Sequence, residues 1–323
     1  MSSDIIKESL EDFGLSKKGK ANALFSKIGI VGCGLVGQNL ARVASYYGLE
    51  VIFIEVSQEK IANALAGITK MMDHRIEHWG LTESEKRANL SRIQGTTDYN
   101  LLKGCDCVIE AIREVDRGNK IKERRAIFRK IEAVVDPDCI IATNSTSVII
   151  TELASDLQYK ERCISLHFLV SSPEARIMEV VKGLYTSEES YQKMCQFVKL
   201  INRTIVPVAE SAGLISIRLF IVCLNEACEI LMEGVALMED IDLTMRVGFG
   251  MRLGPFEVAD KIGLDKVVWW MESIYGEFGD VRYKPSPYIK KLVRAKHYGI
   301  SSGQGFYSYD ENGMKIPGKS KPC

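Results

Sequence analysis

Residues 32–37 read G-C-G-L-V-G, and this short segment constrains the fold more than any other feature of the chain. It follows an apolar run at 27–31, typical of a buried strand, and it opens a helical pattern at 35–47 that Gly48 ends. A second apolar run at 50–55 finishes on Glu55. Strand, glycine turn, helix and strand in this order predict a βαβ unit. With the acidic residue after the second strand, the pattern is typical of a dinucleotide-binding site.

The glycines of this turn serve separate physical purposes. The first allows the tight turn, the second lets a pyrophosphate approach the backbone, and the third lets the helix pack closely on the strand. The N-terminus of the helix would offer free N–H groups and a positive dipole end to the phosphates. The residues of the turn that we expect to line the cofactor are Gly32, Gly34, Leu35, Val36 and Gly37.

Glu55 indicates which dinucleotide to expect. A carboxylate at the end of the second strand accepts hydrogen bonds from the adenosine ribose hydroxyls and repels a 2′-phosphate. We therefore predict that the cofactor is NAD rather than NADP. The alternative is a glycine-rich turn in some other α/β protein, which the surrounding strand, helix and acidic residue disfavour.

Alternating strand and helix patterns continue to about residue 208. An amphipathic helix is expected over 57–79 with Ser57 as its N-cap, and a shorter helix begins near Thr82. Further strands are expected over 107–112, 139–143, 163–168, 178–182 and 204–208. This alternation predicts an α/β fold built on a Rossmann-type, doubly wound sheet.

Beyond residue 210 the strand signals mostly stop, and long helical patterns occupy 214–232 and 241–247. We therefore expect a smaller all-α domain behind the sheet. The predicted organisation is a polar N-terminal extension over 1–26, a Rossmann domain over 27–209 and a helical C-terminal domain over 210–323.

Composition and charge exclude several classes of protein. Hydrophobic residues make up 46% of the 323 residues, which is typical of globular chains, and 42 basic residues balance 42 acidic ones. A neutral chain has no long-range attraction for nucleic acid. No apolar run is long enough to span a membrane, because Arg218 interrupts the longest one, and residues 1–20 lack the apolar core of a secretory signal. We expect a cytoplasmic protein without a nucleic-acid or membrane partner.

The cysteines favour a reducing compartment. There are nine of them at scattered spacings, which does not suit a disulfide framework. Cys105 and Cys107 form the only close pair, and no histidine or second cysteine pair stands nearby to complete a metal site. We therefore expect no metal.

A histidine and a glutamate stand in consecutive apolar runs. His167 lies near the end of 163–168, and Glu179 lies inside 178–182. A carboxylate within an apolar strand is costly to bury unless it has a partner, and His167 is that partner if the strands are neighbours. The pair would fix the imidazole tautomer and make His167 a general base, which beside a nicotinamide means alcohol dehydrogenation. Spacing alone leaves open the alternative that the two side chains never meet.

Taken in order, these motifs resemble those of the L-3-hydroxyacyl-CoA dehydrogenase family, which includes the bacterial 3-hydroxybutyryl-CoA dehydrogenases. The similarity covers residues 27–309. Besides the glycine turn and the spacing of His167 and Glu179, the motifs that carry it are E-A-I-R-E at 110–114, N-S-T-S at 144–147, G-P-F-E at 254–257 followed by Asp260, and G-Q-G-F-Y at 303–307.

The resemblance implies reversible, NAD-dependent oxidation of a short-chain L-3-hydroxyacyl-CoA, such as 3-hydroxybutyryl-CoA, to the 3-oxoacyl-CoA. It implies that His167 takes the hydroxyl proton, that Glu179 orients His167, and that Thr146 lies near the substrate oxygen. It also implies that the helical domain completes the cleft for the acyl-CoA and forms a homodimer. Further residues implied to lie along the cofactor are Ala111, Glu114 and Asn144.

Two positions depart from the family's pattern. Val170, followed by Ser171, and Ile217 stand where the family has asparagines of the polar shell around the substrate. Losing one such donor commonly costs about a hundredfold or more in rate. Ser171, Ser172 and Ser216 are hydroxyls that could substitute. Two alternatives therefore stay open, a dehydrogenase of a 3-hydroxy acid without coenzyme A and a catalytically weak, crystallin-like relative that binds NADH.

Overall fold

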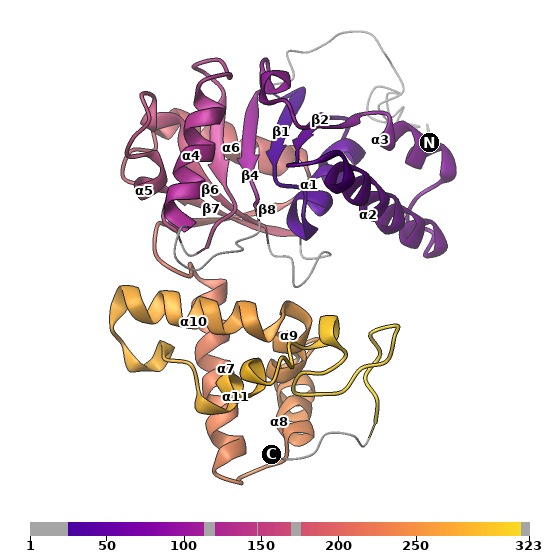
Figure 1. The fold of residues 1–323 in the computed structure, drawn as a ribbon, viewed down its shortest axis with the longest axis vertical. Helices are drawn as coiled ribbons and strands as arrows, with labels where there is room; N and C mark the ends of the chain where they lie inside the picture. Colours follow the sequence, from indigo (N-terminus) through magenta and orange to yellow (C-terminus); the bar gives the residue numbers. More distant parts are fainter. Residues whose placement is uncertain (1–24, 113–119, 147, 169–175, 318–323) are drawn as a thin grey trace, which may run out of the picture.

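The computed structural model describes residues 25–112, 120–146, 148–168 and 176–317. Figure 1 shows two layers of helices around a sheet in the first part of the chain, and a separate group of helices in the second part. The predicted fold class is therefore confirmed.

The described residues form one eight-stranded sheet in the order β3-β2-β1-β4-β5-β6-β7-β8. The six strands from β3 to β6 are parallel, β7 is antiparallel to β6, and β8 is parallel to β7. The strands are β1 (Lys27–Val31), β2 (Glu50–Ile54), β3 (Ile93–Thr96), β4 (Cys107–Glu110), β5 (Ile140–Thr143), β6 (Cys163–Phe168), β7 (Ile177–Lys182) and β8 (Thr204–Ala209).

Helices cover both faces of this sheet, because its strands are apolar on both sides. Side chains of α1 (Leu35–Tyr46), α2 (Gln58–Glu77) and α6 (Glu188–Leu200) build the core on one face. Those of α4 (Lys120–Glu132) and α5 (Ile150–Ala154) build the core on the other. The sheet is thus doubly wound, and the carboxyl ends of its parallel strands share one edge.

Local capping explains where two of the helices begin. The Ser57 side chain accepts a hydrogen bond from the backbone N–H of Lys60 at the start of α2, as its position in the sequence predicted. Thr82 and Glu85 form a reciprocal capping box at the start of α3 (Glu83–Leu90).

Phe25, inside the span assigned to the N-terminal extension, is buried and packs against Phe197.

Two features of the sheet were not predicted. β3 was missed because Gln94, Gly95 and Thr96 give it no apolar run. The antiparallel direction of β7 follows from the chain, since eight residues separate β6 from β7 and a parallel crossover needs about a dozen or more. This reversal places the middle of β7 beside the end of β6.

The described residues of the second domain pack five α-helices around an apolar core of their own. The pattern at 241–247 was expected to be a single helix, but α8 ends at Leu243 and a π-helical turn, Thr244–Gly248, follows it. The helices are α7 (Ser216–Met232), α8 (Met238–Leu243), α9 (Pro255–Ile262), α10 (Leu264–Phe278) and α11 (Pro287–Arg294). None of the helices described is long and apolar enough to cross a membrane.

Asp260 explains two of the C-terminal motifs. Its buried carboxylate accepts hydrogen bonds from the backbone N–H groups of Phe306 and Tyr307 and from the hydroxyl of Tyr309. Burial raises the pKa of Asp260 to about 6, although these hydrogen bonds oppose the shift. A side chain at Gly305 would collide with this carboxylate. The two motifs therefore tie the end of the chain to α9.

A buried ion pair supports the carboxyl end of β4. The Glu110 carboxylate, fully buried, pairs with the Arg124 guanidinium of α4 and accepts a hydrogen bond from the Thr143 hydroxyl at 2.7 Å. It also accepts the backbone N–H of Ile112 at 2.8 Å, which fixes the turn after β4.

We predict that Glu110→Ala destabilises the sheet domain by about 3–5 kcal/mol, because the mutation removes one partner of a buried ion pair. Urea unfolding followed by circular dichroism measures this change. Glu188→Ala is the matched control, since it breaks an exposed ion pair with Lys182 and should leave the unfolding midpoint unchanged. Equal midpoints for Glu110→Ala and the unmodified chain would contradict the assignment.

Candidate active site

The reversal of β7 brings His167 and Glu179 together. The two residues are directly paired in the antiparallel register of β6 and β7, and both are buried. His167 Nδ1 lies 2.5 Å from Glu179 Oε2. Because a carboxylate oxygen can only accept, Nδ1 carries the proton in this pair and the lone pair of the neutral ring is on Nε2.

The start of the helical domain holds the other side of this carboxylate. Glu179 Oε1 accepts hydrogen bonds from the backbone N–H groups of Ile215, at 3.2 Å, and Ser216, at 3.1 Å. The Ser216 hydroxyl donates to Glu179 Oε2 at 3.0 Å. These groups open α7, where a helix has free N–H donors and its positive dipole end.

The charge of Glu179 follows from these contacts. Burial raises the pKa of its carboxyl, but the hydrogen bonds from His167 and Ser216 outweigh this, and the pKa lies below its usual value. Glu179 is therefore an anion, which can stabilise the imidazolium that forms when the ring takes a proton. A buried imidazole with a free Nε2 and an anionic neighbour has the arrangement of a general base.

The segment between the domains is fixed to the sheet domain at two further points, one just after β5 and one on α5. Gly213 N donates to the carbonyl of Thr146 at 2.8 Å, just after β5. The Glu210 carboxylate accepts the backbone N–H of Thr151 at 3.0 Å. The first turn of α7 is thus held against the same edge of the sheet that carries His167.

The glycine turn has the geometry that a dinucleotide requires. Gly32 has φ +91°, and a side chain there would meet the backbone of Ile112 at 2.8 Å. A side chain at Gly37 would meet the Gly32 carbonyl oxygen at 2.3 Å, so α1 packs directly on the turn. Among the described residues, and apart from its chain neighbours Cys33 and Leu35, no atom lies within 4 Å of the position that a Gly34 side chain would take. This open space above the backbone fits the approach of a pyrophosphate.

Other residues predicted for the cofactor lie around this turn. The Glu55 carboxylate closes the loop by accepting the backbone N–H of Cys33 at 2.6 Å, and Leu35 is 60% exposed at the first position of α1. Val36 is half-buried in the same turn, and Ala111 donates its backbone N–H to Val31 at 2.8 Å. Glu114 lies outside the described residues.

The carboxyl end of β5 lies between the turn and the His167–Glu179 pair. The Asn144 side-chain oxygen accepts the backbone N–H of Phe168 at 2.9 Å and so ties β5 to the end of β6. Of the departures from the family pattern, Val170, Ser171 and Ser172 lie outside the described residues. Ile217 is 6% exposed and packs in the core of the helical domain.

Two residues near this site, Glu110 and Ser216, make contacts that the sequence did not predict. Glu110 carries the signal that drew attention to Glu179, a carboxylate inside an apolar strand, but its partner Arg124 lies on a helix rather than on the next strand. From the sequence, Ser216 was expected only as a hydroxyl that could replace a missing asparagine near the substrate. In the structure its hydroxyl is bonded to Glu179 instead.

The fold and the site define the class, a two-domain, dinucleotide-binding oxidoreductase. Residues 27–211 match the NAD binding domain of 3-hydroxyacyl-CoA dehydrogenase, and residues 213–309 match its C-terminal domain. The chain belongs to the 3-hydroxyacyl-CoA dehydrogenase family, and its sheet domain is the family's NAD-binding domain.

Relatives with similar sequences and structures include several named enzymes. The chain is 34% identical to a probable 3-hydroxybutyryl-CoA dehydrogenase of Deinococcus radiodurans over 88% of this chain and 100% of the relative. It is 32% identical to a 3-hydroxybutyryl-CoA dehydrogenase of Clostridioides difficile over the same shares. The crystal structure of (S)-3-hydroxybutyryl-CoA dehydrogenase from Ralstonia eutropha matches with a TM-score of 0.81 and 33% identity, over 89% of this chain and 100% of that one.

We predict that Ser216→Ala lowers kcat about tenfold, since a hydrogen bond to a charged group is worth about 1.5–3 kcal/mol and the backbone N–H remains. Without the hydroxyl the pKa of Glu179 rises, so the acid limb of the pH–rate profile moves to higher pH. Ser216→Thr is the control, because it keeps the hydroxyl and should keep the rate. An unchanged kcat and pH profile in Ser216→Ala would show that the contact has no catalytic consequence.

Proposed function

We propose that this chain catalyses the reversible oxidation of a short-chain L-3-hydroxyacyl-CoA, such as 3-hydroxybutyryl-CoA, to the 3-oxoacyl-CoA, with His167 as the general base. The observation that carries the proposal is the buried His167–Glu179 pair, which lies at the same edge of the sheet as the glycine turn. The short acyl chain is favoured because the relatives with similar sequences are named for 3-hydroxybutyryl-CoA.

The proposed chemistry assigns a role to each residue of the pair. When bound, NAD would supply the acceptor for the hydride of the carbinol carbon. His167 Nε2 takes the hydroxyl proton as the C–O bond becomes a carbonyl, and the charge of Glu179 balances the imidazolium. In the reverse direction the imidazolium returns that proton to the carbonyl oxygen.

The remaining proposed roles concern binding. Glu55 would accept hydrogen bonds from the adenosine ribose, and the backbone at Gly34 and the start of α1 would take the pyrophosphate. Ala111, Glu114 and Asn144 would lie along the rest of the cofactor. Thr146 would place its hydroxyl near the substrate oxygen, because it stands two residues after Asn144, whose side chain accepts the backbone N–H of Phe168, the residue after His167.

We predict that His167→Gln lowers the rate of acetoacetyl-CoA reduction by NADH by about 10²–10⁴-fold, the usual contribution of a general acid–base. The affinity of the His167→Gln variant for NADH should not change, because the imidazole acts on the substrate and not on the cofactor. His297→Gln, a change in the helical domain away from the His167–Glu179 pair, is the control. Steady-state kinetics and calorimetric titration with NADH measure the two effects.

The same assay separates the alternatives. Equal loss of NADH binding and turnover in His167→Gln would contradict its role as the base. Turnover of free 3-hydroxybutyrate, but not of the coenzyme A thioester, would favour a hydroxy-acid dehydrogenase. NADH binding without turnover of either substrate would favour a crystallin-like relative. The packing of Ile217 in the helical core motivates this panel, because it removes one expected amide from the substrate shell.

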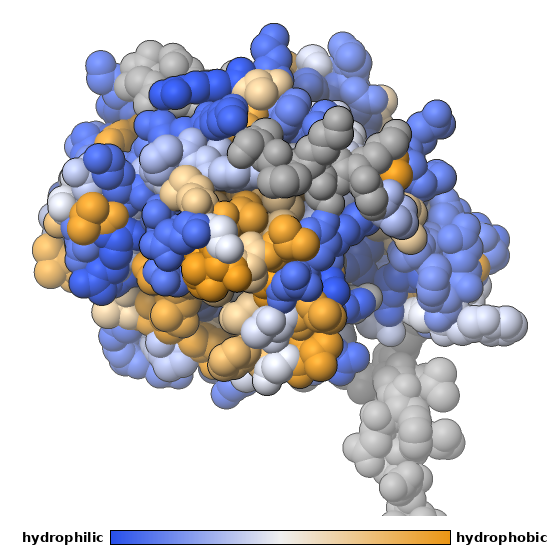
Figure 2. All heavy atoms as spheres, turned by 90° about the horizontal axis from the view of Figure 1, so that it is seen from below, coloured by the Kyte–Doolittle hydropathy of each residue, from blue (hydrophilic) through white to orange (hydrophobic). Residues whose placement is uncertain are grey.

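We also infer that the helical domain forms a homodimer. Figure 2, which views the molecule from below, shows apolar side chains gathered on this end. In the helical domain, large apolar side chains that are strongly exposed include Leu219 of α7 and Val247 and Phe249 after α8, at 69%, 77% and 75%. Exposed apolar surface of this kind is typical of a protein–protein interface.

We expect the chain to sediment at twice its own mass, and we expect Phe249→Asp to weaken the dimer by placing a charge in the interface. Analytical ultracentrifugation over a range of concentrations measures this. Leu184→Asp, at an equally exposed apolar side chain after β7 of the sheet domain, is the matched control. A monomer at all concentrations, or no effect of Phe249→Asp, would contradict the inference.

Finally, we propose that the chain works in the reducing cytoplasm. Eight of its nine cysteines are described, and all eight are free thiols, seven of them buried. Structural disulfides are rare in that compartment.

A further inference from the structure

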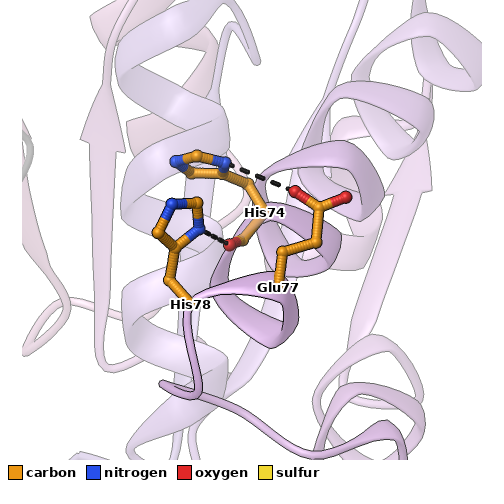
Figure 3. Close-up of side chains that lie close together, drawn as sticks. All are labelled: His74, Glu77 and His78. Carbon is orange, nitrogen blue, oxygen red and sulfur yellow. Dashed lines mark hydrogen bonds and ion pairs between the residues drawn. The ribbon is translucent and has the colours of Figure 1, made fainter.

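We propose that the end of α2 is a binding site for one divalent transition-metal ion of the Zn²⁺ or Cu²⁺ class, separate from the active site. His74, Glu77 and His78 occupy positions i, i+3 and i+4 of the last helical turn, so they lie on one face. Figure 3 shows the two imidazoles and the carboxylate pointing toward one another. None of these residues takes part in the proposed oxidation.

The spacing of the three side chains suits a metal ion. One ligand atom from each residue can be chosen so that all three lie within 4.8 Å of one another, and the two ring centroids are 4.2 Å apart. Metal–ligand bonds of about 2.0–2.2 Å place neighbouring ligand atoms roughly 3–3.5 Å apart in a tetrahedral site. His74 Nδ1 and Glu77 Oε2 are already 3.7 Å apart, and both side chains are 70% exposed. Small rotations of these exposed side chains would therefore bring the ligand atoms to the spacing of a tetrahedral site.

The backbone already orients one of the ligands. His78 Nδ1 lies 2.8 Å from the carbonyl oxygen of His74. A carbonyl oxygen accepts, so Nδ1 carries the proton and the lone pair on Nε2 is available to a metal. A backbone carbonyl on the second ring nitrogen is the usual support of a metal-binding histidine.

The charges favour a cation of a particular kind. Glu77 contributes a negative charge, and the site lies at the C-terminus of a 20-residue helix, the negative end of its dipole. Two imidazole nitrogens and one carboxylate oxygen suit Zn²⁺, Cu²⁺ or Ni²⁺ better than Mg²⁺ or Ca²⁺, which take oxygen ligands. Water would fill the remaining positions, because the turn is exposed.

Four of the described cysteines offer weak competition for such an ion. Only thiolates bind metals well, and burial raises the pKa of Cys33, Cys139, Cys163 and Cys228 to about 12. Cys323 lies outside the described residues, so the experiment is best done in a Cys323→Ser background.

The test is calorimetric titration of the full chain, without an affinity tag, with ZnCl₂ and separately with CuCl₂. We expect one equivalent to bind, with Cu²⁺ tighter than Zn²⁺. Mutation of a residue that only supports a metal ligand typically lowers metal affinity by roughly 10–100-fold. His74→Ala and His78→Ala each remove a ligand, so each should weaken binding by at least that much. His297→Ala is the matched control and should leave the affinity unchanged. Mg²⁺ should not compete.

Trp79 gives an independent readout. It directly follows His78 and is 97% exposed, whereas Trp269 and Trp270 lie on α10 of the other domain. Bound Cu²⁺ should quench its fluorescence, and Trp79→Phe should remove the quenched component without changing the affinity. Absence of binding, or equal binding to the His74→Ala and unmodified chains, would overturn the proposal. Quenching that persists in Trp79→Phe would place the ion elsewhere and would overturn it too.

Discussion

The carboxylate of Glu179 joins the two domains at the point where the chemistry is proposed to occur. One oxygen is bound to His167 of the sheet, and the carboxylate also receives the first N–H groups and the Ser216 hydroxyl of α7. The same carboxylate therefore orients the imidazole and positions the helical domain. A shift of α7 would withdraw three hydrogen bonds from a buried anion, which is costly.

The topology of the sheet makes this junction possible. In an open α/β sheet, ligands bind beyond the carboxyl ends of the parallel strands. The glycine turn after β1, the turn after β4 and the end of β5 all lie at that edge. The antiparallel β7 brings Glu179 to the same edge from the opposite direction, opposite His167 of β6. The α7 helix then starts where its N-terminus meets that carboxylate.

The sequence predicted the parts of the structure that depend on local pattern. The glycine turn, the cap at Ser57 and the apolar strands are local, because each needs only its neighbours in the chain. β3 was missed because its residues give no apolar signal, and its place in the sheet depends on pairing with β2. The contacts of Ser216 and Glu110 were also beyond reach, since each partner lies at a distance in the chain that no pattern encodes.

The most direct test of this account is the protonation state of His167, which ¹⁵N NMR of histidine-labelled protein measures. The signals are assigned by comparison with His167→Gln. The account predicts that the neutral ring carries its proton on Nδ1, shifted far downfield by the short bond to Glu179, and its lone pair on Nε2. A neutral ring with its proton on Nε2 would leave no lone pair facing the substrate, and it would contradict the proposed base.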